Sequence, residues 1–404
     1  MGVVKSTNYD ALLSRRARLT TARGRLGAAG GAPSPLYLFG AGQPDPGSFP
    51  YKDIVTATEK AIAAEGRQLF MYGDALGYAG LRNLVCEKTK HFEGFEVSSD
   101  EVLITNGSSH AISLVCDAFV DLGDTIISEA PTFSGTLHNF RRYGPEIVSV
   151  GLDDEGIRTD ELEERLKDLD RQGRKAKFIY TIVNFQNPAG MTQSLRRRQE
   201  LLRLADKYDT LILEDDAYGE LRYDGEAIQS LYGLDESGRV IRSGTLSKIL
   251  GAGVRLGWLL APPELIPRFS AFKTDGGTNP YMSRVATFYM REHMIPHVEE
   301  LRGVYRQKRD LMLERLHAGL GDGAEVSRPD GGFFIWIRLP EGTDPAKLVG
   351  LAAERRVQYV PGNAFYPSAD EGTEYIRLAF SFATLDEIRA GVDLLCEAIK
   401  AARA

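Results

Sequence analysis

A lysine surrounded by hydroxyl residues, glycines and an arginine is the first candidate for chemistry in the sequence. Residues 243–257 read SGTLSKILGAGVRLG. Thr245, Ser247 and Arg255 can bind a phosphate group, and a guanidinium can do so through two parallel hydrogen bonds. Lys248, placed among cations and apolar neighbours, is expected to have a lowered pKa and to be able to form a Schiff base. The alternative is a basic turn between two strands.

Three acids and a tyrosine follow a buried apolar run. Residues 211–218 read LILEDDAY, which places Asp215 and Tyr218 at the end of a predicted strand. Binding and catalytic groups gather at the carboxyl ends of strands in open α/β sheets. One of the carboxylates could keep a cationic ring nitrogen in its charged form. The alternatives are a solvated strand end and a metal site, and the metal site is disfavoured because no histidine lies nearby.

Two turn segments complete the set of candidate chemical residues. Residues 184–190 read NFQNPAG and contain Asn187, and residues 105–110 read TNGSSH between a predicted strand and a predicted helix. Backbone N–H groups of a glycine turn and a helix N-terminus form an anion site. The alternatives are a plain Asn-Pro-Gly turn in the first segment and ordinary helix capping by Ser108 in the second.

The elements that must position these residues alternate between strands and helices from about residue 55 to 265. Such alternation favours a mostly parallel sheet covered by helices. After about residue 290 the pattern predicts a long helix over 297–320, isolated strands at 333–338 and 374–380, and a last helix capped by Thr384. The strands of the first part are predicted at 101–105, 125–128, 146–150, 177–183, 210–214, 239–242 and 256–260.

Composition and charge exclude several classes of protein. The chain has 404 residues, 43% hydrophobic and 26% charged, and a net charge of −7, which is typical of a soluble globular protein and disfavours generic nucleic-acid binding. No apolar run approaches the ~18 residues of a membrane span. The three cysteines are far apart and predict free thiols in a reducing compartment, with Cys116 and Cys396 in the core. We therefore expect a cytoplasmic protein with no metal and with neither nucleic acid nor a membrane as a partner.

Taken together and in this order, the segments resemble the fold type I pyridoxal-phosphate enzymes, and among them the class I/II aminotransferases. The resemblance covers roughly residues 36–400, and the segment FGAGQPDP at 39–46 is similar to the aminoadipate/multi-substrate branch. It implies an aspartate-aminotransferase-like α/β fold with a large three-layer domain, a mostly parallel sheet and a smaller α+β domain. The expected division is 1–50 for the N-terminal arm and part of the small domain, 51–295 for the large cofactor-binding domain and 296–404 for the small domain.

The resemblance also implies a role for each candidate residue. Lys248 would form the internal aldimine with pyridoxal 5'-phosphate and move the proton, and Asp215 would pair with the pyridine nitrogen. Tyr218 and Asn187 would bond the ring oxygen, and Phe133 would stack on the ring. The phosphate would be held by Gly107, Ser108, Ser109, Thr245, Ser247 and Arg255.

Three further residues take roles from the resemblance. Arg377, in the segment YIRLAFS, would clamp the α-carboxylate of the substrate, and Gly42 would lie in the loop beside that carboxylate. Tyr72, in the segment YGDALGY, would reach the phosphate of a neighbouring subunit, which implies a homodimer with shared active sites. The sequence departs from the family pattern at Ser109, where Gln is frequent, at Phe133, where Tyr is frequent, and at Ala189, where Thr is frequent. The change at Ser109 puts in doubt part of the side-chain binding of the phosphate.

The implied activity is transfer of the α-amino group of an amino acid to a 2-oxo acid, with 2-oxoglutarate as the expected acceptor. The alternatives on the same fold are a β-lyase, a decarboxylase, a cyclase or an oxidase of amino acids. A transcription regulator built on this fold is disfavoured because the cofactor-domain pattern begins by about residue 40. A basic N-terminal segment is expected to receive a side-chain carboxylate through one of its arginines, which are Arg15, Arg16, Arg18, Arg23 and Arg25.

Overall fold

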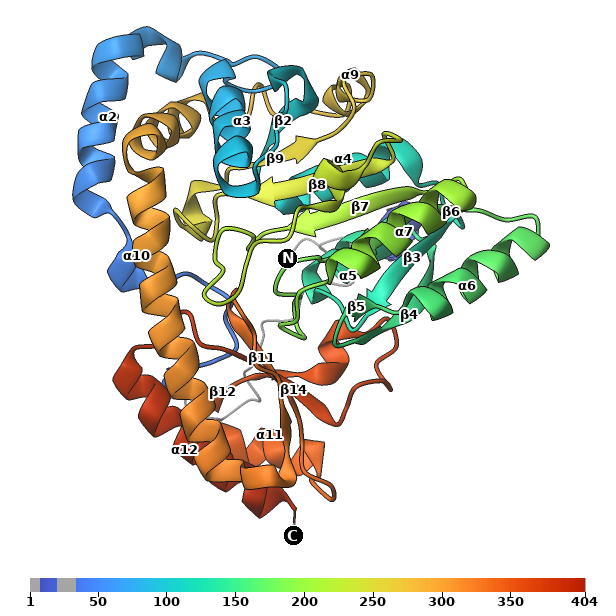
Figure 1. Cartoon of the computed structure of the whole chain (residues 1–404), viewed down its shortest axis with the longest axis vertical. Coiled ribbons are helices and arrows are strands. Elements are labelled where there is room, and N and C mark those ends of the chain that lie inside the picture. The colour runs from blue at the N-terminus through green and yellow to red at the C-terminus, as the bar shows by residue number, and fades with distance from the viewer. Residues whose placement is uncertain (1–7, 20–33, 404) are drawn as a thin grey trace, which may run out of the picture.

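An eight-stranded sheet lies at the centre of the larger part of the molecule (Figure 1). The computed structural model describes residues 8–19 and 34–403. The strand order is β2-β9-β8-β7-β6-β3-β4-β5; the run from β8 to β4 is parallel, whereas β9 and β5 are antiparallel to their neighbours. The strands are β2 (Val102–Thr105), β3 (Thr125–Ala130), β4 (Glu146–Asp153), β5 (Gly156–Ile157), β6 (Ala176–Thr181), β7 (Leu211–Asp216), β8 (Val240–Thr245) and β9 (Gly257–Leu260).

Helices cover both faces of this sheet, which makes three layers. Side chains alternate between the faces of a strand, so adjacent residues pack on different helices. Leu213 and Ile241 pack on the first face and Ile212 and Val240 on the second. The first face is covered by α4 (Ser108–Phe119), α5 (Ser134–Arg141) and α9 (Ile266–Ser270), and the second by α6 (Thr159–Arg171), α7 (Leu195–Lys207) and α8 (Leu231–Leu234). The predicted mostly parallel sheet in a three-layer arrangement is confirmed.

A small antiparallel sheet of order β10-β11-β14-β13 forms the second part of the molecule. Thr384 begins the last helix, and its side chain and that of Glu387 cap each other's backbone N–H groups, as the sequence predicts. A separate parallel pair joins β1 to β12 beside this sheet. The elements are β1 (Tyr37–Leu38), β10 (Glu325–Val326), β11 (Phe334–Arg338), α11 (Pro345–Glu354), β12 (Val357–Gln358), β13 (Val360–Pro361), β14 (Tyr375–Ala379) and α12 (Leu385–Ala402).

One long helix, α10 (Pro280–Leu320), runs beside both sheets (Figure 1). It packs against α2 (Tyr51–Glu65) and α3 (Ala79–Glu93) near its start and against α12 farther on. The sequence predicted only its second half, from 297, whereas the helix begins at Pro280 behind the capping side chain of Asn279. The division expected between residues 295 and 296 therefore falls inside a continuous helix, at Pro296.

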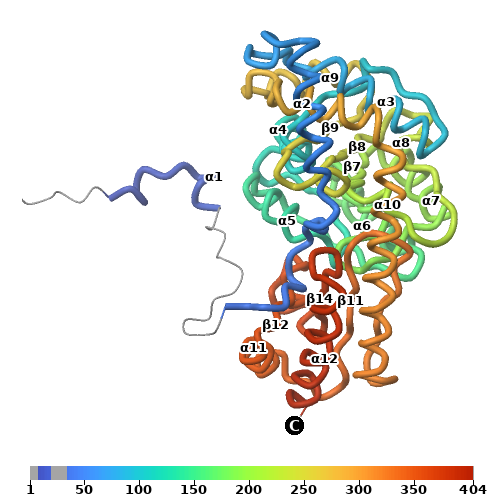
Figure 2. Tube along the Cα trace, turned by 90° about the vertical axis from the view of Figure 1, so that its left-hand side faces the viewer, coloured from blue at the N-terminus to red at the C-terminus, as the bar shows by residue number. Residues whose placement is uncertain are grey.

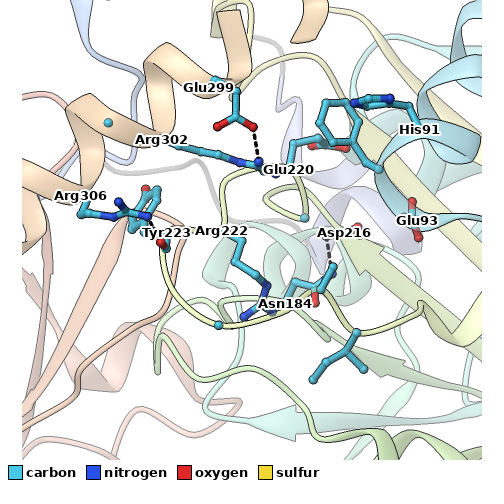
Figure 3. Close-up of a pocket in the computed structure, with 16 residues that line it drawn as sticks. His91, Glu93, Asn184, Asp216, Glu220, Arg222, Tyr223, Glu299, Arg302 and Arg306 are labelled. Atoms are coloured by element: carbon cyan, nitrogen blue, oxygen red, sulfur yellow. Dashed lines mark hydrogen bonds and ion pairs between the residues drawn. The ribbon is translucent and has the colours of Figure 1, made fainter. Parts of the chain in front are cut away.

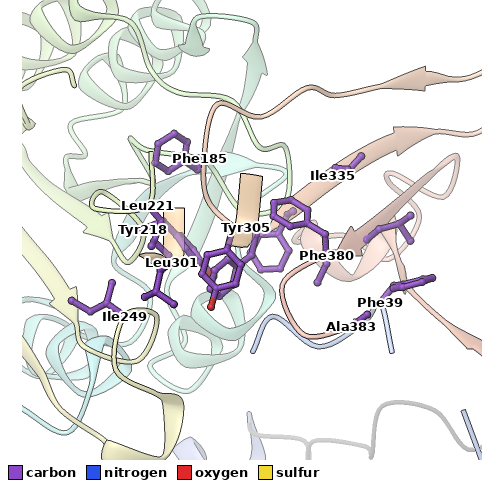
Figure 4. Close-up of a cluster of buried hydrophobic side chains, with 14 of the residues drawn as sticks. Phe39, Phe185, Tyr218, Leu221, Ile249, Leu301, Tyr305, Ile335, Phe380 and Ala383 are labelled. Atoms are coloured by element: carbon purple, nitrogen blue, oxygen red, sulfur yellow. The ribbon is translucent and has the colours of Figure 1, made fainter. Parts of the chain in front are cut away.

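A buried cluster of apolar and aromatic side chains fills the space between the two sheets (Figure 4). Tyr305 from α10 packs against Phe333, with ring centroids 4.8 Å apart, and Phe333 packs against Tyr218 at 5.2 Å. Figure 4 shows Tyr305 between Leu301 and Phe380, so the small sheet, the long helix and the end of β7 share one core. Burial of large aromatic rings fixes how the two sheets sit relative to one another.

The described part of the N-terminal arm contacts the large-sheet layer through α1 (Arg15–Arg18), seen at the edge of the molecule in Figure 2. The guanidinium of Arg16 lies 4.0 Å from the centroid of the Tyr143 ring and 3.4 Å from a carboxylate oxygen of Asp117. Arg23 and Arg25, two of the arginines expected to receive a substrate carboxylate, lie outside the described residues.

Two predictions from composition can be compared with the described residues. Cys116 and Cys396 are buried and all three cysteines are free thiols, as expected. None of the helices that the structure describes has both the length and the apolar character of a membrane span.

Candidate active site

A cavity of about 630 Å³ lies where the carboxyl ends of the central strands face the small sheet. Strand ends at this edge of a parallel sheet are where open α/β proteins bind ligands. Twelve of the predicted site residues line it, although they come from segments spread over more than 300 residues of the sequence. The lining ones are Gly42, Ser108, Ser109, Phe133, Asn187, Asp215, Tyr218, Thr245, Ser247, Lys248, Arg255 and Arg377.

Lys248 lies just after β8 with its amine inside the cavity. Its Nζ donates a hydrogen bond of 2.8 Å to the carbonyl oxygen of Gly42 and lies 5.4 Å from the ring centroid of Tyr218. Burial lowers the pKa of Lys248 from 10.5 to about 8, and the nearby cation of Arg377 contributes to the shift. Because desolvation disfavours the charged form, this amine is deprotonated at a much lower pH than an ordinary lysine.

Asp215 is a buried carboxylate, 6% exposed, in the wall of the same cavity. It accepts hydrogen bonds from the hydroxyl of Tyr180 at 2.7 Å and from that of Ser243 at 2.9 Å. It forms no ion pair with a described residue, and burial raises its pKa. Burying a carboxylate is costly without a cation, so the site suits a cationic group placed next to Asp215.

Sequence reasoning missed Tyr180 and Ser243, which hold this carboxylate. Ser243 is the direct cross-strand neighbour of Asp215, and Tyr180 is the neighbour of Leu213, two residues before Asp215. Residues in register and two apart share a face of the sheet, so all three side chains point the same way. The signal was therefore present in the strand alternation, but it could be used only once the strand order was known.

The acid next to Asp215 faces the other side of the sheet. Asp216 forms an ion pair with Arg242 and accepts a hydrogen bond from Asn184 at 3.2 Å. Burial alone would raise the pKa of Asp216, but Arg242 and Lys88 outweigh burial and lower it. Of the acids that end β7, only Asp215 lines the cavity described above.

A second cavity of about 540 Å³ lies behind the end of β7, between the end of α3 and α10 (Figure 3). Asp216 and Asn184 point toward each other in its inner wall, and Arg302 pairs with Glu299 at its rim. Glu220, also in this wall, pairs with Lys88. The carboxylates here are matched by basic side chains, which is the arrangement of a structural ion-pair network.

The first turn of α4 and the loop after β8 form one polar corner of the first cavity. Gly107, which precedes α4, has φ +79°, and a Cβ there would lie 2.9 Å from Nη2 of Arg255. The Thr245 and Ser247 hydroxyls are 2.9 Å apart. Arg255 donates to the carbonyl oxygen of Asn106 at 3.0 Å and forms no ion pair with a described carboxylate. Hydroxyls, a guanidinium and a helix N-terminus are the groups that bind a phosphate.

Arg377 forms the opposite wall and is held by neutral partners only. It donates to the side-chain oxygen of Asn187 at 2.9 Å and to the carbonyl oxygen of Gly40 at 2.7 Å. Its Nε is buried and has no hydrogen-bond partner among the described residues. Burial lowers its pKa to about 10, and its guanidinium lies 4.2 Å from the ring centroid of Phe334. A carboxylate ligand would satisfy this cation.

Gly107 and Tyr72 lie outside the lining of the cavity, and so do Arg15, Arg16 and Arg18 of the N-terminal segment. Gly107 lies next to Arg255, which does line the cavity. Tyr72 is 95% exposed in the loop before α3, and it is not among the residues that line the cavity. The sequence did not single out several lining residues, namely Gly40, Ala41, Gln43, Ser134, Gly135, His138, Arg141, Ile182, Ala217, Ala252, Phe334, Val360 and Ala364.

These groups fit pyridoxal 5'-phosphate. The amine of Lys248 can condense with an aldehyde, and the buried carboxylate of Asp215 can match a protonated pyridine nitrogen. The polar corner around Arg255 can take the phosphate, and Phe133, at the start of α5, lines the cavity as a flat apolar surface. The cofactor would thus satisfy a buried anion at one end and a cluster of donors at the other.

Comparisons with known proteins agree with this fit. The model of the family "Aminotransferase class I and II" matches residues 34–399. Aromatic-amino-acid aminotransferase 1 of Thermococcus litoralis is 38% identical over 91% of this chain and 88% of its own length. The multiple substrate aminotransferase of Thermococcus profundus superposes with a TM-score of 0.91 at 36% identity, over 98% of this chain and 99% of that one.

A third relative is a structure with a cofactor derivative. The alpha-aminoadipate aminotransferase of Thermus thermophilus, complexed with N-(5'-phosphopyridoxyl)-L-leucine, superposes with a TM-score of 0.86 at 31% identity, over 98% of this chain and 99% of that one. The cavity, its donor set and the match over nearly the whole described chain lead to one conclusion. The protein belongs to the class I and II aminotransferase family and is a pyridoxal-phosphate-dependent aminotransferase.

Proposed function

We propose that this aminotransferase moves the α-amino group of an amino acid to 2-oxoglutarate, with Lys248 as the residue that binds the cofactor and moves the proton. The observation that carries the proposal is the position of the Lys248 amine, which has a lowered pKa and shares one cavity with Asp215 and Arg377. When bound, pyridoxal phosphate supplies an electron sink for the substrate α-carbon and a carrier for the amino group. The chain's own residues orient that chemistry.

Asp215 and Tyr218 would set the electronic state of the ring. The ionised carboxylate of Asp215 favours the protonated form of a neighbouring pyridine nitrogen, because an opposite charge stabilises the charged form. Tyr180 and Ser243 would hold Asp215 in place through the two hydrogen bonds described above. The hydroxyl of Tyr218 and the amide of Asn187 would bond the ring oxygen, and Phe133 would stack on the ring face.

The polar corner would anchor the phosphate. Backbone N–H groups at the first turn of α4 are unsatisfied within the helix and carry the positive end of its dipole. The guanidinium of Arg255 adds a full positive charge. The anchoring set would be Gly107, Ser108, Ser109, Thr245, Ser247 and Arg255.

Arg377 would bind the α-carboxylate of the substrate, with Gly42 close by. A Cβ at Gly42 would lie 2.6 Å from the Phe334 ring, so only glycine lets the loop approach this wall. With the carboxylate fixed, the free amine of Lys248 would move a proton between the substrate α-carbon and the cofactor carbon that carries the amino group. A base with a pKa near the working pH does this best, which a value of about 8 provides.

A homodimer with shared active sites forms part of the proposal. Phe70, Met71 and Tyr72 are exposed next to one another before α3, at 74%, 53% and 95%. Contiguous exposed apolar side chains mark interaction surfaces. In the homodimer Tyr72 would reach the cofactor phosphate of the partner. The division of the chain into large and small domains and the cytoplasmic location stay predictions.

Two half-reactions test the proposed function. Mixing the yellow holoenzyme with one amino donor, without an acceptor, should convert it to the pyridoxamine form, and adding 2-oxoglutarate should restore the colour. A panel of acidic, aromatic and aliphatic donors would identify the preferred class. Release of ammonia, carbon dioxide or a thiol in place of the stoichiometric half-reaction would contradict the proposal and support a lyase, decarboxylase or oxidase.

A further inference from the structure

The active-site cavity holds one basic side chain to which the proposed function assigns no role. Its charged lining residues are Lys248, Arg255, Arg377 and Arg141 against the single acid Asp215. In the proposed function Arg255 meets the phosphate, Arg377 meets the α-carboxylate and Asp215 meets the ring nitrogen. Arg141 is then left as a cation that lines the cavity without a matching anion.

Arg141 is held at the cavity by neutral oxygens alone. It is the last residue of α5, the helix that begins directly after Phe133. Its Nη2 donates to the carbonyl oxygen of Pro367 at 3.0 Å and to that of Tyr366 at 3.4 Å. It is exposed and forms no ion pair within the described part of the chain. A guanidinium has five N–H donors, so most of this one remains available to a carboxylate, which binds it more strongly than a carbonyl does.

Arg141 and Arg377 flank the same short segment of chain. Arg377 lies 4.8 Å from the ring centroid of Phe365, and Arg141 contacts the carbonyls of the next two residues, Tyr366 and Pro367. Residues two apart in a chain have Cα atoms at most about 7 Å from one another. The segment is tied to the start of α5 by a hydrogen bond of 2.8 Å from the N–H of Thr132 to the carbonyl oxygen of Phe365. The two cations thus line one cavity and contact neighbouring residues of the same segment.

We propose that Arg141 is a specificity-determining residue that binds the distal carboxylate of a dicarboxylic substrate while Arg377 binds its α-carboxylate. The proposal rests on the proposed function, since it deepens the substrate class of the same site. A five- or six-carbon amino or 2-oxo diacid would meet both guanidiniums. A substrate with an apolar side chain would leave Arg141 on the carbonyls of Tyr366 and Pro367.

The chain offers a matched control in the next residue. Arg142 is also an exposed arginine at the end of α5, but it does not line the cavity, and its Nη1 lies 3.5 Å from the side-chain oxygen of Asn139. Arg141→Gln and Arg142→Gln remove the same charge from the same helix end. Arg141→Lys keeps the charge and loses the two-pronged geometry, so it should restore part of the effect.

The test compares glutamate with leucine as donors for the holoenzyme and its variants. Loss of a charge-assisted contact should lower kcat/KM for glutamate about 10- to 100-fold in Arg141→Gln and leave leucine within about twofold. Arg142→Gln should change neither, and Arg141→Lys should fall between. An equal loss for both donors, or no loss for glutamate, would overturn the proposal.

A binding measurement separates this proposal from the proposed function. Glutarate is an unreactive dicarboxylate probe and butyrate an unreactive monocarboxylate probe, and calorimetry on the holoenzyme reports their Kd without turnover. Arg141→Gln should weaken glutarate about tenfold or more and leave butyrate unchanged. Absence of transamination with every donor would remove the proposed function, yet the glutarate result would still decide whether Arg141 binds a distal carboxylate. Unchanged glutarate binding would reject it in either case.

Discussion

Replacing Asp215 by Asn should slow the chemical step by about 10²- to 10⁴-fold. Asp215 is buried, and the proposed function makes it the sole anion beside a protonated ring nitrogen. Removing one partner of a buried charge pair costs about 3–5 kcal/mol, because the other charge is left without compensation. Each 1.36 kcal/mol corresponds to about tenfold in rate, which sets the expected range. The asparagine keeps the size of the side chain and can still accept the hydrogen bond from Tyr180 at its oxygen.

The assay is the half-reaction with a saturating amino donor, followed by the loss of yellow colour in a stopped-flow instrument. Asp216→Asn is the matched control, since it removes the adjacent acid from the opposite face of the sheet. Arg242 and Lys88 lower the pKa of Asp216 against its burial, so its ionised form stabilises the fold at neutral pH. The control should therefore lower Tm and leave the half-reaction rate within a few-fold of the wild type.

A folding defect can be separated from a catalytic one in the cofactor-free protein. Burial raises the pKa of Asp215, so its ionised form destabilises the empty protein, increasingly as the pH rises through the raised value. Asp215→Asn removes that cost, and its cofactor-free form should have a Tm at neutral pH equal to or above that of the wild type. The reasoning is refuted if Asp215→Asn binds the cofactor and runs the half-reaction within tenfold of the wild-type rate.

Three further predictions concern the other walls of the cavity. Capture of the cofactor aldehyde by the cofactor-free protein, followed by stopped-flow absorbance, should rise with pH with a midpoint near 8, as the Lys248 amine loses its proton; a midpoint near 10.5, the value of an ordinary lysine, would contradict this prediction. Arg377→Gln should raise that midpoint, since Arg377 helps to lower the pKa of Lys248, and should reduce kcat/KM for every amino donor about 10- to 100-fold in steady-state assays. Gly107→Ala should weaken cofactor binding by about 1–3 kcal/mol, because φ is +79° and the new Cβ would lie 2.9 Å from Arg255. Gly123→Ala, at φ +90° with open space around it, is the control that should lower Tm without changing the Kd of the cofactor in a fluorescence titration.

Local patterns in the sequence were enough for the strands and for the motif around the lysine. β-branched apolar runs bounded by turn residues predicted seven of the eight strands of the large sheet, because a strand buried on both faces needs such a run; the two-residue strand β5 was missed. The segment around Lys248 resembles the family closely enough to predict both the family and the cofactor. This was possible because the lysine and several of the phosphate-binding side chains are close together in the sequence. The capped start of α12 at Thr384 was equally local.

Features that depend on contacts between distant segments could not be predicted from local sequence patterns. The first half of α10 was missed because its buried side chains, such as Val285 and Met290, face α2 and α3, and the partners of a helix face are unknown before folding. Arg141 gave no signal either, because its place at the cavity depends on the end of α5 meeting the segment 366–367.

The sequence by itself determined that acids end β7, that a reactive lysine follows β8 and that the chain alternates between strands and helices. Only the tertiary structure decided that Asp215 faces the cavity while Asp216 faces Arg242, and that Tyr180 and Ser243 support the first of them. The physical reason is the two-residue period of a strand. It obliges adjacent side chains to point to opposite faces, but which face carries the cavity is set by the order of the strands and by the elements packed on either side.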